Sequence, residues 1–287
     1  MATALLVIVR KGVRMGSSAP EPPMDRPLRL LVPALALLVG LILLPARGQA
    51  AEVDLALVLA VDISNSMDPD EQELQRQGFV EAFRSRLVHD AIRNGMLGRV
   101  VVTYMEWAGA TNQHVVVPWT EIGAAEDALS FADQLARAPI RRAPRTSISG
   151  AIDFSVGLLA QRQGDALRQV IDVSGDGANN QGRTVTQARD EAVAKGITIN
   201  GLPLMLKRPA SVWDVETLDE HYRDCVIGGP GAFMIPVRER AQFAEAIKTK
   251  IIREIAGREP GLPIIPAQAQ AANCLAAENP YWDRWRN

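Results

Sequence analysis

Three short segments of the 287-residue chain carry oxygen-bearing side chains in an arrangement that suits a divalent cation. Asp62, Ser64 and Ser66 alternate directly after an apolar run, so one loop holds a carboxylate and two hydroxyls. Thr146 lies in a second, hydroxyl-rich segment, and Asp176 stands between two glycines in a third. Carboxylate and hydroxyl oxygens, without histidine or cysteine, are the ligands that Mg²⁺, Mn²⁺ or Ca²⁺ prefers.

These segments form a site only if the fold brings them together. Asp62 follows the apolar run 55–61 and Asp176 follows the run 169–173, and such short continuous runs are typical of strands buried on both faces. A first helix is predicted from the capping residues Asp68, Pro69 and Glu71 to before Gly95, with Leu87 on its apolar side. Further strands are predicted at 99–107, 114–119, 197–202 and 233–237, and further helices at 124–136, 149–163, 184–195 and 241–255.

Alternating strands and helices predict a doubly wound α/β fold, in which helices cover both faces of a mostly parallel sheet. The pair 99–107 and 114–119 reads as a hairpin and supplies one antiparallel edge strand. A single domain over 53–257 accounts for all of these elements. Ligands of open α/β sheets bind beyond the carboxyl ends of the strands, which is where the polar segments are expected.

The first fifty residues are expected to lie outside this domain. Residues 30–44 are apolar, Arg26 and Arg29 precede them, and small residues lead up to Ala50, a pattern typical of a secretory signal peptide cleaved after Ala50. An uncleaved membrane anchor is the alternative, although the apolar stretch is shorter than the ~20 residues of a spanning helix. Residues 258–287 form a Pro- and Ala-rich tail. The expected location is the periplasm of a Gram-negative bacterium.

Charge argues against a nucleic-acid partner. The chain carries 31 basic and 33 acidic residues, and nucleic-acid binding requires a basic face. Removal of residues 1–50 makes the remainder more acidic. Export also favours a disulfide between Cys225 and Cys274, which would close a loop of about fifty residues and contribute about 4 kcal/mol in the chain-entropy model. Two free thiols are the alternative.

The ordered pattern Asp62-x-Ser64-x-Ser66, Thr146 and Asp176 resembles the metal-ion-dependent adhesion site of von Willebrand factor A domains. The stretches YMEWAG, RTSISGAIDFS and DCVIGGPGAF further resemble an uncharacterised bacterial branch of exported A-type domains, for which no activity is assigned. The resemblance implies a divalent ion, usually Mg²⁺, held by these five side chains. It also implies that a carboxylate from another protein completes the metal shell.

Several of these residues have simpler interpretations. Thr146 is the expected ligand, but it is also placed to cap a helix, in which case Ser147 or Ser149 would replace it. Asp176 suits a turn as well as a metal. Asp68 and Asp70 are interpreted as acids at a helix start rather than as a second cation site.

Glu106 and the arginines near Thr146 also have two interpretations each. Glu106 and Trp107 end a strand near the expected site, where they either line it or are ordinary strand-end residues. Arg141, Arg142 and Arg145 form either a solvated loop or a surface that attracts an acidic partner.

The sequence leaves two classes of function. The leading hypothesis is an exported, non-enzymatic module that binds a protein ligand with an acidic side chain through a divalent ion. The alternative is a hydrolase that uses the same ion as a Lewis acid on phosphate esters. No lysine or histidine near the three segments is placed as a general acid or base, which favours the binding module.

Overall fold

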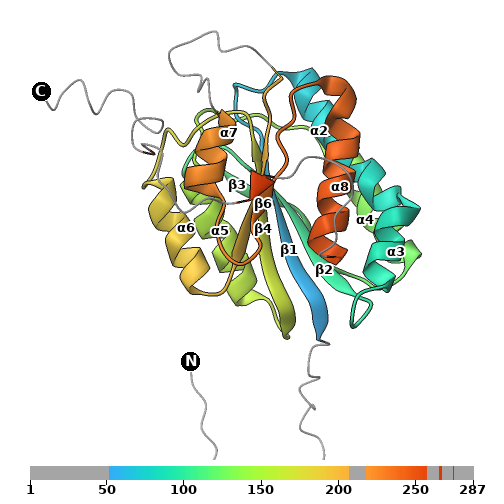
Figure 1. Ribbon diagram of the computed structural model, residues 1–287. Helices are drawn as coiled ribbons and strands as arrows, with labels where there is room; N and C mark the ends of the chain where they lie inside the picture. Colours follow the sequence, from blue (N-terminus) through green and yellow to red (C-terminus); the bar gives the residue numbers. More distant parts are fainter. Residues whose placement is uncertain (1–51, 207–217, 257–264, 267–273, 275–287) are drawn as a thin grey trace, which may run out of the picture. The chain divides into compact units, whose positions relative to one another are not determined.

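The computed structural model describes residues 52–206, 218–256, 265–266 and 274. Their strands form one sheet in the order β3-β2-β1-β4-β5-β6-β7 (Figure 1). The strands are β1 (Val53–Asp62), β2 (Val100–Trp107), β3 (Gln113–Ile122), β4 (Ala166–Gly175), β5 (Thr198–Pro203), β6 (Phe233–Met234) and β7 (Ile265–Pro266). All neighbouring pairs are parallel except β2–β3 and β6–β7. The predicted sheet and its antiparallel edge strand β3 are confirmed, and β7 adds a second antiparallel edge from the tail.

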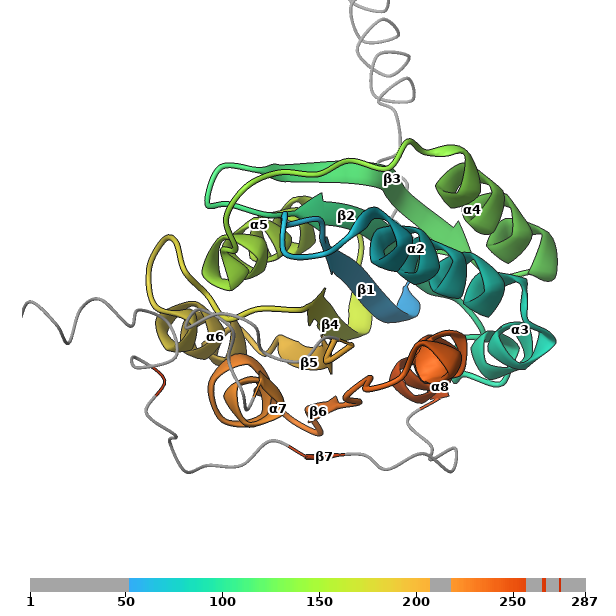
Figure 2. The ribbon, with the colours of Figure 1, turned by 90° about the horizontal axis from the view of Figure 1, so that it is seen from above.

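Helices cover both faces of the sheet, as the doubly wound prediction requires (Figure 2). One face is covered by α2 (Pro69–Arg84), α3 (Arg86–Arg93), α4 (Ala125–Arg137) and α8 (Phe243–Ala256). The other is covered by α5 (Ile148–Gln161), α6 (Val185–Ala194), α7 (Leu218–His221) and the π-helix η1 (Tyr222–Val226). A short 3₁₀ turn, η2 (Arg240–Gln242), precedes α8. Every residue of β1 is buried, because apolar layers lie on both sides of it.

The prediction of one continuous helix up to Gly95 is wrong. The structure has two helices, α2 and α3, which meet at Ser85. The Ser85 backbone is extended, and its hydroxyl accepts a hydrogen bond from the Leu87 N–H at 3.3 Å, so this serine caps a new helix. The change of direction leaves Leu87 59% exposed instead of on the buried side.

The predicted signal peptide and most of the tail lie outside the described residues. Among the residues that are described, no helix has the length and hydropathy needed to cross a bilayer. The elements α7 and η1 have no counterpart in the predicted helices and strands. They lie between β5 and β6, where the sequence shows no apolar periodicity.

A buried charge cluster joins the sheet to α8. Lys250 of α8 forms ion pairs with Asp172 of β4 at 2.6 Å and with Glu254 at 2.5 Å, and all three side chains are at most 1% exposed. Asn200 of β5 donates a hydrogen bond to Glu254 at 3.0 Å. Burial, followed by the charge of Glu254, raises the pKa of Asp172 to about 7. Two carboxyl groups therefore share one cation in the core.

Candidate metal site

The ends of β1 and β4 bring two of the polar segments to one edge of the sheet. The two strands are parallel neighbours, with Val61 opposite Ser174, so Asp62 and Asp176 emerge side by side. The sheet extends from this pair in opposite directions, toward β2 and β3 on one side and β5 and β6 on the other. Figure 2 looks down on this edge. Such a switch point is the usual ligand site of a doubly wound sheet.

Four of the five predicted ligands form a continuous chain of contacts. The Ser64 N–H donates to Asp62 Oδ1 at 2.6 Å, which folds the loop around the carboxylate. The hydroxyls of Ser64 and Ser66 lie 2.7 Å apart, and the Ser66 hydroxyl donates to Asp176 Oδ1 at 2.6 Å. Asp62 and Ser64 are buried, Ser66 is exposed and Asp176 is half-buried. The cluster therefore has a dry floor and a rim open to solvent.

Thr146 lies beside this cluster, attached to the loop that carries Asp176. The Thr146 N–H donates to Asn180 Oδ1 at 2.9 Å, and the Asn180 N–H donates to the Thr146 carbonyl at 2.8 Å. A methyl group built on Gly177 would lie 3.8 Å from Thr146 Oγ1, in ordinary contact. The third polar segment is thus next to the other two, as the predicted site requires.

The two serines that compete with Thr146 have other partners. The Ser147 hydroxyl caps α5 by accepting from the Gly150 N–H at 3.1 Å, and it donates to the Gln181 carbonyl at 2.8 Å. The Ser149 hydroxyl donates to Asn179 Oδ1 at 3.2 Å. Because Ser147 is the helix cap, the structure excludes the capping interpretation of Thr146.

The loop before Thr146 also holds the segment that carries Ser64 and Ser66. The Ala143 N–H donates to the Ile63 carbonyl at 3.0 Å, and Arg142 donates to the carbonyls of Asn65 and Met67 at 2.9 and 2.7 Å. Arg142 is therefore a structural clamp rather than a fully solvated side chain. Arg145 has a φ of 75° and is the only non-glycine among the described residues with a positive φ. Strain of this kind, directly before Thr146, is typical of functional loops.

Asp68 acts as predicted at the start of α2. It is the N-cap, its carboxylate accepts from the Glu71 N–H at 2.8 Å, and Glu71 returns the bond to the Asp68 N–H at 3.0 Å. Arg240 forms an ion pair with Asp68 at 3.4 Å. The capping interpretation of Asp68 is confirmed.

Glu106 faces inward and forms a buried ion pair with Arg76 of α2. Arg76 also donates to the carbonyls of Leu135 and Ala138 at 3.1 and 3.0 Å. Burial raises the pKa of Glu106, and the guanidinium of Arg76 opposes that shift. Trp107 is fully buried in the apolar layer under α5. Of the two interpretations of Glu106 and Trp107, the structure favours ordinary strand-end residues.

The electrostatics at Asp62 fit a bound cation. Asp62 is completely buried, and its Oδ2 has no hydrogen-bond partner among the described residues. Burial, followed by the negative charge of Asp176, raises the pKa of Asp62 well above its ordinary value. A buried carboxylate next to a second one is costly unless positive charge neutralises it. The described residues hold no group of three or more His, Cys, Asp or Glu side chains suited to a metal, so the hydroxyls would be needed as ligands here.

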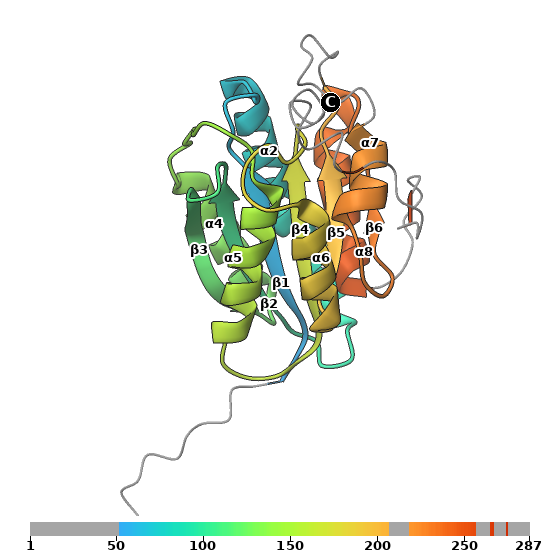
Figure 3. The same ribbon diagram turned by 90° about the vertical axis from the view of Figure 1, so that its left-hand side faces the viewer.

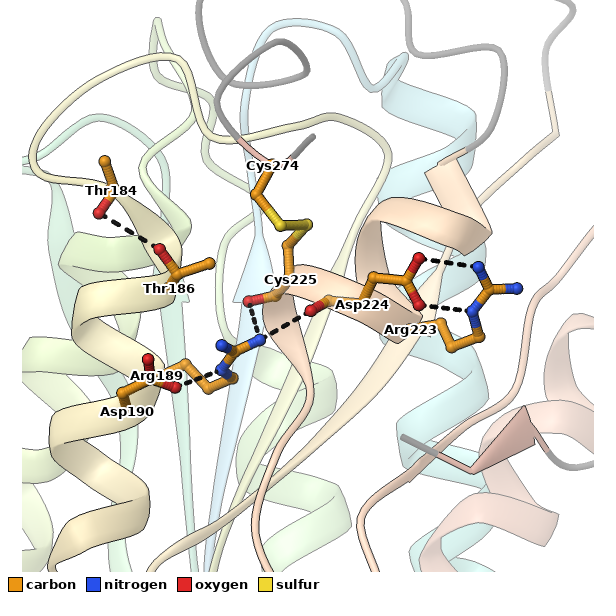
Figure 4. Close-up of a disulfide and its surroundings, with 8 residues drawn as sticks. All are labelled: Thr184, Thr186, Arg189, Asp190, Arg223, Asp224, Cys225 and Cys274. Atoms are coloured by element: carbon orange, nitrogen blue, oxygen red, sulfur yellow. Dashed lines mark hydrogen bonds and ion pairs between the residues drawn. A yellow bond between two sulfur atoms is a disulfide. The ribbon is translucent and has the colours of Figure 1, made fainter. Parts of the chain in front are cut away.

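The predicted disulfide is present and is attached to η1. Cys225 of η1 is bonded to Cys274 of the tail (Figure 4). The predicted pairing of the two cysteines is confirmed. Tyr222 is the first residue of the same π-helix and is not among the residues predicted for the site, although a methyl group on Gly175 at the end of β4 would lie 3.0 Å from its hydroxyl.

Replacing Gly175 by alanine is expected to disturb the site directly. The added methyl group would lie 2.9 Å from Asp62 Oδ2, closer than a Cβ tolerates, and in tight contact with the Tyr222 hydroxyl at 3.0 Å. We expect a loss of about 1–3 kcal/mol in the free energy of unfolding, because overpacking forces neighbours to shift. Urea denaturation of Gly175→Ala measures this loss.

Gly157→Ala is the matched control for that experiment. Gly157 lies in α5, and a methyl group there meets nothing within 4 Å. Alanine is the better helix former by about 1 kcal/mol, so this variant is expected to be as stable as the wild type or more so. Equal stability of Gly175→Ala and wild type would contradict the close packing at Gly175.

Comparisons with known proteins agree with this fold. The model of a family described as "Protein of unknown function (DUF1194)" matches residues 52–259. No curated protein matches the chain in sequence. Similar solved structures include a von Willebrand factor type A protein from Catenulispora acidiphila, with a TM-score of 0.51, 10% identity, and coverage of 71% of this chain and 43% of that one.

Two further structures share the fold. The pilus adhesin SpaC from Lactobacillus rhamnosus GG has a TM-score of 0.53 at 13% identity, covering 72% of this chain and 31% of that one. Proximal thread matrix protein 1 from the mussel byssus, with a zinc-occupied MIDAS motif, has a TM-score of 0.50 at 15% identity, covering 72% and 49%. The chain spans less than half of each of these three proteins. The resemblance to the von Willebrand factor A fold is confirmed.

Proposed function

We propose that this chain, which belongs to the family of unknown function DUF1194, is a binding module. It would recruit a protein ligand through a divalent metal ion. The observation that supports the proposal is the contact chain from Ser64 through Ser66 to Asp176, built on the buried carboxylate of Asp62. Asp62, Ser64, Ser66, Thr146 and Asp176 would hold the ion.

Each of these residues would have its own part in holding the ion. The buried floor, with Asp62, Ser64 and Thr146, would exclude water from one side of the ion. Ser66 and Asp176 stand at the open rim. Neutral hydroxyl ligands withdraw little charge, so a bound ion would supply positive charge that attracts a carboxylate from another protein. The ligand set is made of hard oxygens, which favours Mg²⁺, with Mn²⁺ or Ca²⁺ as substitutes.

The basic residues on the rim support an acidic partner. Arg141, Arg142 and Arg145 are exposed on the loop before Thr146, and Arg142 also donates a hydrogen bond to the Asn65 carbonyl. Their charges would complement a carboxylate-rich surface and would speed encounter with it. We propose export to the periplasm, with residues 1–50 as the signal peptide and 53–257 as the binding domain. Residues 258–287 would then be a tail that the disulfide between Cys274 and Cys225 attaches to the domain.

Metal-dependent capture tests this function. The mature chain is immobilised and exposed to an envelope extract of the source cell, with Mg²⁺ or with chelator. A protein that binds only with Mg²⁺, and that a glutamate-rich peptide displaces, is the expected result. Asp62→Ala is expected to lower the metal affinity about 100-fold or more, since loss of even a supporting residue costs 10–100-fold.

Two outcomes would contradict the proposal. Absence of Mg²⁺, Mn²⁺ and Ca²⁺ binding in calorimetry of the wild type would remove the metal. Metal-dependent turnover of a generic phosphate ester that Asp62→Ala abolishes would favour the hydrolase instead. Asp70→Ala is the matched control, because it removes a carboxylate from the exposed first turn of α2 and is expected to leave metal binding unchanged.

A further inference from the structure

Tyr222 places a phenol hydroxyl at the candidate metal site from an unexpected element, the π-helix η1 on the α5, α6 and α7 face of the sheet (Figure 3). The side chain is fully buried, and its hydroxyl has no hydrogen-bond partner among the described residues. Asp62 Oδ2 is also buried and likewise without a partner in the described part of the chain. Both oxygens face Gly175, at 3.0 and 2.9 Å from the position of a methyl group there.

Two glycines on neighbouring strands make room for this tyrosine. Gly201 of β5 lies under the ring, where a methyl group would be 2.8 Å from Tyr222 Cδ1. Gly175 at the end of β4 lies under the hydroxyl. Larger residues at either position would push the ring away from Asp62, so the backbone is shaped around the phenol. Isolated π-helical turns occur frequently at functional sites.

The element that carries Tyr222 is held in place at its other end. Cys225 is bonded to Cys274, and Arg189 of α6 donates to the carbonyls of Asp224 and Cys225 at 2.8 and 3.1 Å (Figure 4). These attachments restrict η1 and therefore the ring of Tyr222. A hydroxyl held in this way loses little conformational entropy when it forms a hydrogen bond.

We propose that Tyr222 is a positioning residue of the metal site, whose hydroxyl donates a hydrogen bond to one water that in turn donates to Asp62 Oδ2, and so orients that carboxylate toward the ion. The inference rests on the proposed function, because it requires that the site binds a metal. The hydroxyl is a donor at neutral pH because a phenol is then protonated. Burial, followed by the charges of Asp62, Asp176 and Asp172, raises the pKa of Tyr222 further.

Tyr222→Phe tests this role, because it removes one oxygen and keeps the ring. We expect Mn²⁺ affinity, measured by calorimetry, to fall 10–100-fold, the usual effect of losing an orienting partner. The paramagnetic resonance spectrum of bound Mn²⁺ is expected to change as well, which a purely structural role would not cause. Tyr104→Phe is the control: Tyr104 is equally buried, but it lies on β2 in the other apolar layer. Its affinity is expected to match the wild type.

A measurement on the wild type covers the case in which Tyr222→Phe fails to fold. The chain has three tyrosines, and addition of metal is expected to produce a tyrosine absorption difference, which Tyr104→Phe retains. Wild-type affinity in folded Tyr222→Phe, or no absorption difference in the wild type, would overturn the inference while leaving the proposed function intact. Absence of metal binding by the wild type would instead overturn the proposed function and the inference with it.

Discussion

Mg²⁺ at one hundred times its Kd is expected to raise the free energy of unfolding of the metal-free protein by about 2.7 kcal/mol, and Asp62→Asn is expected to abolish the rise. The ion would bind the folded chain alone, because the five ligands come from three distant segments. Each kcal/mol of stabilisation corresponds to a rise of roughly 2–4 °C in Tm for a domain of this length. Thermal unfolding with and without chelator measures it.

Asparagine is the informative substitution, because it keeps the shape of the side chain. In the absence of metal, Asp62 is a buried carboxylate beside Asp176. Its replacement by a neutral amide removes that desolvation and repulsion, so Asp62→Asn is expected to be at least as stable as the metal-free wild type. Asp70→Asn makes the same change of charge at an exposed position and should retain the full response to Mg²⁺. A full response in Asp62→Asn would exclude Asp62 as a ligand.

The sheet and its polar edge were predictable from the sequence, for a physical reason. Strands buried on both faces are continuous apolar runs, and β1 is buried at all ten of its positions. Parallel strands end at the same edge, so a polar residue directly after each run must lie close to the others. Asp62 and Asp176 follow this rule. The break between α2 and α3 was not predictable in this way, because a single serine, Ser85, ends one helix and caps the next within an unbroken amphipathic pattern.

The surroundings of the site depend on contacts that local patterns do not encode. Tyr222 is the first residue of η1, an element without periodicity, and reaches the site only because Gly175 and Gly201 leave space on two strands. Arg142 carries the same charge as Arg141, yet it clamps the loop at Asn65 because of where its backbone lies. Residue type indicates that such side chains are polar or basic. The fold alone decides which of them become part of the site.

Lys250→Met is expected to cost about 3–5 kcal/mol in the free energy of unfolding, the largest effect of any single substitution proposed for this chain. Lys250 is the buried cation between Asp172 and Glu254, at 2.6 and 2.5 Å. Methionine fills a similar volume but leaves two buried carboxyl groups without a counter-charge. Urea denaturation measures the loss. Lys248→Met on the same helix is the control: Lys248 is partly exposed and pairs with the exposed Glu245, so it should cost no more than about 1 kcal/mol.

The pH dependence of this loss follows from the raised pKa of Asp172. The pKa in the folded protein is about 7, above the ordinary value of 3.8, so between these values the folded state binds more protons than the unfolded state. Stability conferred by protonated Asp172 is thus lost as pH rises through about 7, by at most about 1.4 kcal/mol per pH unit. Without Lys250, burial of the ionised carboxylates of Asp172 and Glu254 costs still more free energy. Lys250→Met should therefore be more destabilised at pH 8 than at pH 5. Adding Asp172→Asn should recover stability at pH 8, because one of the two buried charges is then gone. An equal loss at both pH values would show that Lys250 acts through packing and not through its charge.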